Sequence, residues 1–102
     1  MSVLTVNKEN FDSVKNSEKT VLLDFYADWC GPCRMVSPLV DQIAEERADV
    51  LVGKINVDDS PELAAQFGVA SIPTLMVMRG GAIVSQTTGA RPKAQILALL
   101  EG

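Results

Sequence analysis

The sequence contains no histidine and only two cysteines, Cys30 and Cys33, among its 102 residues. Catalysis by a Ser–His or Cys–His pair within this chain is therefore excluded, and so is a metal site with histidine ligands. Apolar runs extend over only a few residues, far short of the ~20 that a membrane-spanning helix needs. The first residues lack a basic segment followed by an apolar one, so we expect no signal peptide, no membrane partner and a cytoplasmic protein.

Positive charge is also scarce. Nine Lys and Arg residues stand against 13 Asp and Glu residues, which gives a net charge of −4, and the basic residues are scattered singly. Binding to nucleic acid needs clustered Lys and Arg side chains, so we expect no nucleic-acid partner. The length and the 47% hydrophobic content are ordinary for a soluble globular protein. We therefore predict that residues 1–102 form one domain that works as a monomer.

The hydrophobic pattern predicts strands and helices in the order β-α-β-α-β-α-β-β-α. Strands are predicted over residues 3–6, 21–27, 51–57, 74–78 and 82–87, and helices over 8–15, 32–47 and 61–67 and from 92. This order predicts an α/β protein with a central mixed five-stranded sheet, in which a parallel half is followed by an antiparallel hairpin and four helices flank the sheet.

Local signals indicate where several elements begin and end. Asn7 is a candidate cap for the first helix, and Ser60, followed by a proline and an acid, is one for the third. Gly68 is expected to end that third helix. The segment Arg79-Gly80-Gly81 predicts a hairpin turn.

The second helix carries one wide apolar stripe, which we expect to face the core. Pro38 lies inside this pattern, and because the periodicity continues on both sides we expect a kink rather than a break. The stripe consists of Met35, Val36, Leu39, Val40 and Ile43.

The two cysteines form a C-x-x-C pair at the junction of the first long strand and the first long helix. Three interpretations compete. A zinc site would need four ligands, and this pair supplies two unless the metal is shared between chains. A purely structural disulfide would close so short a loop that it stabilises the fold weakly, and the cytoplasm would tend to reduce it.

The third interpretation, redox chemistry, has a mechanism. Cys30 is predicted at the amino end of a helix, where unpaired N–H groups and the helix dipole favour a thiolate. Cys33 follows one turn later on the same side. Pro32 suits the helix start. Cys30 can then attack a target disulfide, and Cys33 can resolve the mixed disulfide that results.

Beyond the pair itself, the segment Trp29-Cys30-Gly31-Pro32-Cys33 is the active-site signature of the thioredoxin family, which this sequence resembles over essentially its whole length. The matching positions occur in order and at the expected spacing. They also include Asp24-Phe25-Tyr26-Ala27, Pro38, Lys54, Ile72-Pro73-Thr74, Gly81 and Gly89.

The resemblance implies the thioredoxin fold and a protein-disulfide reductase that carries electrons as a dithiol. It also implies recycling by a thioredoxin reductase, which contains flavin and takes its electrons from NADPH, with no cofactor bound to this chain. The Gly-Pro pair between the cysteines is similar to that of reducing members of the family. Gly31, Pro32, Lys54 and Pro73 are expected to support the active site.

Asp24 is a carboxylate in the middle of an apolar strand. Burying it costs several kcal/mol unless it is neutralised or paired. It is either a satisfied core residue or a proton acceptor for Cys33 whose pKa burial raises; we favour the acceptor. By resemblance Lys54 lies in the adjacent strand, where it could moderate that shift or simply reach for solvent, and we weigh the two equally.

The surface expected to meet targets lies around the cysteines. The resemblance implies that the Ile72–Pro73 peptide bond is cis and that the Ile72 backbone is exposed to pair with a target peptide. Trp29 could be a core residue, but beside the cysteines we expect it half exposed, forming an apolar patch with Ile72, Gly89 and Ala90.

Two other hypotheses remain open. The domain could be a binding subunit of a larger assembly in which the cysteines are incidental, or a specialised oxidoreductase that serves one partner. The intact cysteine pair together with Asp24 favours a general reductase of disulfide-containing proteins over the first of these.

Overall fold

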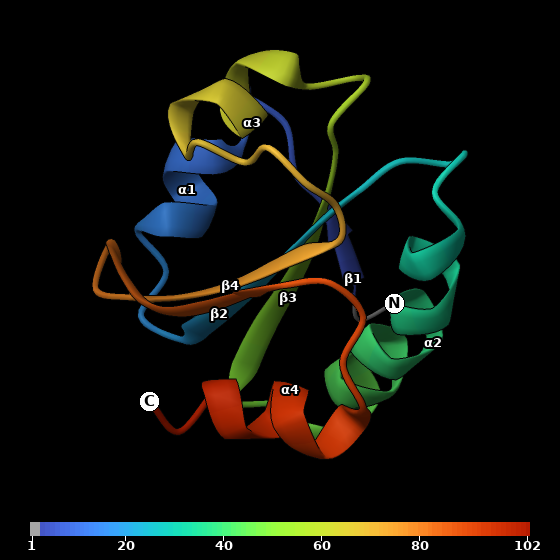
Figure 1. Cartoon of the computed structure of the whole chain (residues 1–102). Helices are drawn as coiled ribbons and strands as arrows, with labels where there is room; N and C mark the ends of the chain where they lie inside the picture. Colours follow the sequence, from blue (N-terminus) through green and yellow to red (C-terminus); the bar gives the residue numbers. More distant parts are fainter. Residues whose placement is uncertain (1–2) are drawn as a thin grey trace.

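A computed structural model describes residues 3–102 and shows one mixed five-stranded sheet between two pairs of helices (Figure 1). The predicted fold class is confirmed, and the elements agree with the predicted ones to within one residue except at the start of the first helix. The elements are β1 (Val3–Thr5), α1 (Phe11–Lys15), β2 (Thr20–Tyr26), α2 (Gly31–Glu46), β3 (Val50–Asn56), α3 (Pro61–Gln66), β4 (Thr74–Arg79), β5 (Ala82–Thr88) and α4 (Lys93–Leu99).

The strands lie in the order β1-β3-β2-β4-β5. β3 pairs in parallel with β1 and with β2, whereas β4 is antiparallel to β2 and to β5. Gly80 and Gly81 connect β4 to β5 with φ values of +62° and +81°, as a two-residue hairpin turn requires. The parallel half and the antiparallel hairpin therefore meet at β2, the strand that leads into the cysteine pair.

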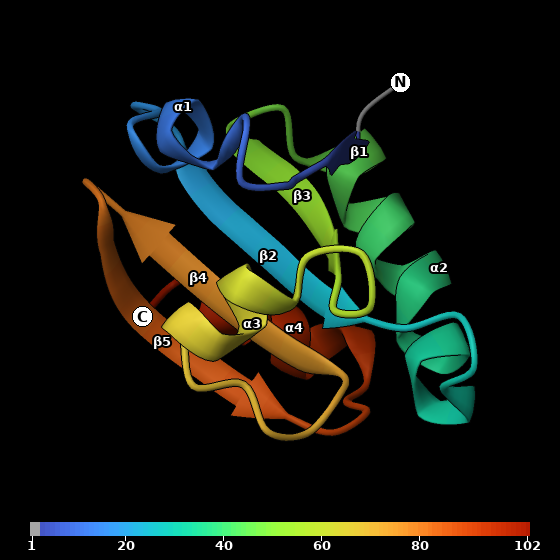
Figure 2. The same cartoon turned by 90° about the horizontal axis from the view of Figure 1, so that it is seen from above.

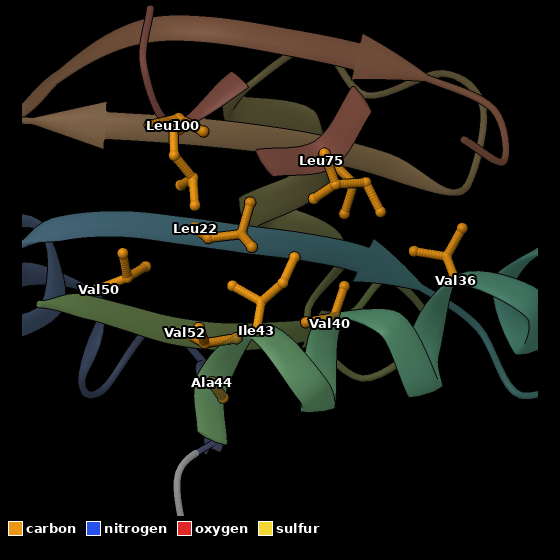
Figure 3. Close-up of a cluster of buried hydrophobic side chains, with 11 residues drawn as sticks. Leu22, Val36, Val40, Ile43, Ala44, Val50, Val52, Leu75 and Leu100 are labelled. Carbon is orange, nitrogen blue, oxygen red and sulfur yellow. The ribbon is translucent and has the colours of Figure 1, made fainter. Parts of the chain in front are cut away.

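Helices cover both faces of the sheet, α1 and α3 on one side and α2 and α4 on the other (Figure 2). Successive β2 side chains point to opposite faces, so Leu22 packs under α2 and α4 while Leu23 packs under α1 and α3. Figure 3 shows the α2 side of this core, where Leu22 and Leu75 from the sheet face Val40 and Ile43.

The first helix begins later than predicted. Residues 8–10 form a turn in which Asn7 Oδ1 accepts the N–H groups of Glu9 at 3.0 Å and Asn10 at 3.2 Å. Asn10 therefore stands at the cap position instead of Asn7, without a side-chain cap bond. An Asn side chain bonds readily to its own local backbone, and here that competes with helix formation.

The apolar stripe of α2 was predicted partly on the wrong side. Met35 is 69% exposed, and the buried face is centred on Val36, Val40 and Ile43. Spacings of four and three follow one face of a helix more closely than repeated steps of four. The helix continues through Pro38 as expected. The shift of the stripe leaves Met35 at the surface, two residues beyond Cys33.

A candidate redox-active disulfide site

The two cysteines occupy the amino-terminal turn of α2. Cys30 is the N-cap residue and its Sγ accepts the backbone N–H of Cys33 at 3.2 Å, while Gly31 and Pro32 form the first turn between them. The two sulfurs are joined as a disulfide, with Cα atoms 5.3 Å apart. Helix geometry thus brings both sulfurs together where unpaired N–H groups favour negative charge on Cys30 in the reduced state.

The loop before β4 approaches the disulfide from the opposite side. The Ile72–Pro73 peptide bond is cis, and the Ile72 carbonyl oxygen lies 3.8 Å from Cys30 Sγ. Gly89, which follows β5 with φ +98°, donates its N–H to the Pro73 carbonyl oxygen at 2.8 Å. Three segments distant in the sequence therefore meet at one end of the sheet.

Trp29 is more exposed than expected, with 68% of its surface accessible. Its indole Nε1 donates to Asp58 Oδ2 at 2.8 Å, which anchors the ring to the loop after β3. Asn56 Oδ1 in turn accepts the Asp58 N–H at 2.8 Å. The indole is thus held outside the core beside the disulfide.

Behind the disulfide, Asp24 is 1% exposed on β2. Neither of its carboxylate oxygens accepts a hydrogen bond from any residue of 3–102. Burial raises the pKa of Asp24 to about 6, while the positive charge of Lys54 lowers it and the negative charge of Asp41 raises it further. The predicted direction of the pKa shift is confirmed, and of the two alternatives for Lys54 the moderating one holds.

Lys54 is the neighbour of Asp24 in the parallel pair of β2 and β3, but its ammonium is bound elsewhere. Its Nζ lies 2.8 Å from Asp41 Oδ1 and also donates to Ser37 Oγ, both on α2. Neither Ser37 nor Asp41 was among the site residues expected from the sequence. The spacing Cys33, Ser37, Asp41, with steps of four, could have indicated that all three share one side of the helix.

A separate apolar groove lies on the side of the sheet that α2 and α4 cover. It has a volume of about 320 Å³ and lies between α2 and the start of α4. Ala90, a residue expected in the target patch, lines it together with Met35, Leu39, Arg91 and Pro92. The rest of the expected patch, Ile72 and Gly89, lies half-buried near Cys30. Met35 was missed because the sequence pattern assigned it to the core.

A C-x-x-C disulfide at the start of a helix that covers a mixed sheet, with a cis-proline loop against it, defines a thiol–disulfide oxidoreductase. Comparisons with known proteins give the family. The family model for thioredoxin matches residues 2–102, and the chain belongs to the thioredoxin family. Within it, the chain works as a dithiol redox carrier.

Individual relatives are similar over nearly the whole chain. The thioredoxin of Alicyclobacillus acidocaldarius is 47% identical over 97% of this chain and 95% of the relative. That of Haemophilus influenzae is 49% identical over 92% and 90%. A solved structure, that of a mutant thioredoxin from Halobacterium salinarum NRC-1, is similar with a TM-score of 0.91 and 39% identity, covering 98% of this chain and 88% of that one.

Across residues 3–102, none of the helices combines the length and the apolar character needed to cross a membrane.

Proposed function

We propose that this oxidoreductase reduces disulfides in other proteins, with Cys30 as the attacking thiolate, Cys33 as the resolving thiol and Asp24 as the proton acceptor. The observation that supports the division of roles is the position of the two sulfurs on α2, with Cys30 at the N-cap and Cys33 one turn inside. The resemblance of the whole chain to thioredoxins points to the same chemistry.

In the first step the Cys30 thiolate attacks one sulfur of a target disulfide. A bond forms between Cys30 and that sulfur, the target S–S bond breaks, and the other target sulfur leaves as a thiolate. The helix dipole and the N–H of Cys33, which points at Cys30 Sγ, favour the attacking thiolate over the thiol.

In the second step Cys33 resolves the mixed disulfide. Its S–H proton passes to the Asp24 carboxylate, and the sulfur keeps the electron pair and attacks Cys30 Sγ. The Cys30–Cys33 disulfide forms and the second target thiolate leaves, so two electrons have moved to the target. A carboxylate with a pKa of about 6 is close to the range in which a group exchanges protons efficiently at neutral pH.

The surface for the target lies around Cys30. We propose that the Ile72 backbone pairs with an extended target segment, because its carbonyl lies 3.8 Å from the attacking sulfur of Cys30. Trp29, Gly89 and Ala90 complete an apolar surface that the target covers. We propose that Gly31 and Pro32, between the cysteines, Lys54 on β3 and Pro73 in the loop against Cys30 support the site.

The oxidised protein then needs two electrons from elsewhere. We propose that a flavin-containing thioredoxin reductase supplies them from NADPH, and that residues 1–102 act as a single monomeric domain in the cytoplasm without a bound cofactor. The similarity to thioredoxins over nearly the whole chain supports this cycle.

The test is reduction of insulin in the presence of NADPH and a thioredoxin reductase. The rate of turnover is measured as the loss of NADPH absorbance. We expect turnover that depends on this protein and is lost in the Cys30→Ser variant. A binding subunit with incidental cysteines would give no turnover and would keep its biological role without them, and that result would contradict the proposal.

A further inference from the structure

Near Asp24, the Lys54 ammonium bonds to Ser37 and Asp41, while the Asp24 carboxylate has no hydrogen-bond partner among residues 3–102. Lys54 and Asp24 are directly paired between β2 and β3, so their side chains leave the same face of the sheet from strands about 4.8 Å apart. The Lys54 ammonium nevertheless bonds to Asp41 at 2.8 Å and to Ser37. Both oxygens of Asp24 are left without a hydrogen bond from residues 3–102.

Attraction between pairs of charges alone would favour a contact of Lys54 with Asp24 over its contact with Asp41. The Asp41 side chain is 55% exposed, and an ion pair in such a position contributes little because water screens it. The same ammonium against a buried carboxylate would be attracted more strongly. Two α2 side chains acting together offset that attraction, since they satisfy two of the three donors of the ammonium.

We propose that Ser37 and Asp41 are positioning residues that hold the Lys54 ammonium on α2, so that the Asp24 carboxylate stays free to take the Cys33 proton. The inference rests on the proposed function, in which Asp24 is that proton acceptor. If the ammonium bonded to Asp24 instead, the carboxylate would be a weaker base, and the S–H proton of Cys33 would transfer to it less readily.

Two charged groups shift the pKa of Asp24, so the contribution of each can be tested separately by substitution. The charges that shift the pKa of Asp24 are those of Lys54 on β3 and Asp41 on α2. Cys33 and Glu45 are the titratable residues that lie two turns before and one turn after Asp41 on α2, and Tyr26 leaves β2 on the same face as Asp24. On β4 the direct partner is Leu75, which carries no charge. Asp41 therefore acts on Asp24 in two ways, directly through its negative charge and indirectly by holding Lys54.

The experiment follows the carboxyl carbon of Asp24 by NMR during a pH titration of the oxidised protein, in which neither cysteine titrates. We expect the midpoint to fall by about 1 pH unit in Asp41→Asn, in the range for an opposite charge that moves into contact, and by less in Ser37→Ala. The matched control is Glu46→Gln, which removes another α2 carboxylate that pairs with a lysine at 2.8 Å. Its midpoint should stay unchanged.

A second set of variants separates positioning from the direct charge effect. In Lys54→Met there is no ammonium to hold, so adding Asp41→Asn should lower the midpoint much less than it does when Lys54 is present. Equal shifts in the two backgrounds, or no shift in Asp41→Asn, would overturn the inference.

Turnover distinguishes this inference from the proposed function. If both are correct, the pH at which target reduction is half-maximal falls together with the Asp24 midpoint in Asp41→Asn. A midpoint that falls while the pH profile stays fixed would support the positioning role and contradict Asp24 as proton acceptor.

Discussion

At the scale of single residues, Cys30 and Cys33 differ mainly in their position on α2, and this difference leads to a trapping experiment. Cys30→Ser should abolish disulfide reduction, because the thiolate at the helix end is lost. Cys33→Ser should still attack targets and should accumulate as a mixed disulfide, because nothing resolves it. Mass spectrometry after incubation of the reduced variants with an oxidised target measures the adduct. Accumulation on Cys30→Ser instead would reverse the roles.

Trp29 should report the redox state of the neighbouring disulfide. The indole is exposed and fixed by its bond to Asp58, and a disulfide one residue away can quench its excited state. We expect emission to rise when a reductant is added, with no change in a Cys30→Ser/Cys33→Ser control. Because Trp29 is the only tryptophan, the spectrum has one source. Unchanged emission in the wild type would mean that the ring points away from the pair.

At the scale of elements, the packing of β3 beside β1 depends on Gly53. A Cβ built there would lie 2.6 Å from Val6 Cγ2 and 3.3 Å from Leu23 Cδ2. Both neighbours are buried, so Gly53→Ala should destabilise the fold by about 1–3 kcal/mol through overpacking. Denaturant unfolding measures the change.

The matched control for this substitution is Gly31→Ala, where a Cβ would meet nothing within 4 Å. Its stability should stay close to that of the wild type, because a helical start tolerates alanine. If the two variants unfolded at the same denaturant concentration, close packing at Gly53 would not contribute to the stability of the fold.

At the scale of the whole molecule, we expect Asp24 to lower the stability of the fold and to increase the rate of target reduction. Its pKa is about 6 in the fold against ~3.9 in the unfolded chain. Because the folded value is the higher one, the folded state binds more protons between these values, and stability falls as the pH rises through that window. The loss reaches about 3 kcal/mol above pH 6, while below pH 4 it disappears.

Asp24→Ala should therefore unfold at a higher denaturant concentration than the wild type at pH 8, and the difference should shrink towards pH 4. The same variant should reduce targets more slowly, by up to about 100-fold, because Cys33 loses its proton acceptor. Unfolding curves across pH and insulin turnover measure the two effects. A variant that is less stable at pH 8 yet fully active would mean that Asp24 is an ordinary core residue.

Much of the architecture followed from the sequence because its causes are local. Three features each restrict the backbone within a few residues: the apolar run around Leu22 and Phe25, the Gly80-Gly81 turn and Pro32 at the start of α2. The order of the elements was then compatible with few sheet topologies, since connections are short and crossovers between parallel strands are right-handed. Asp24 could be identified as a candidate site residue for a similarly local reason. A charged residue within an apolar strand is costly wherever that strand is buried.

Tertiary structure alone decided which partners the polar side chains of the site take. Sequence neighbours could not show that Asp58 meets Trp29 across 29 residues, or that Lys54 bonds to Asp41 rather than to Asp24. Such choices depend on where α2 lies over the sheet, and they are decided by small differences between desolvation, screening and hydrogen bonding. The exposure of Met35 has the same origin, because helix rotation about its axis is set by packing against β2 and β3 and not by the helix itself.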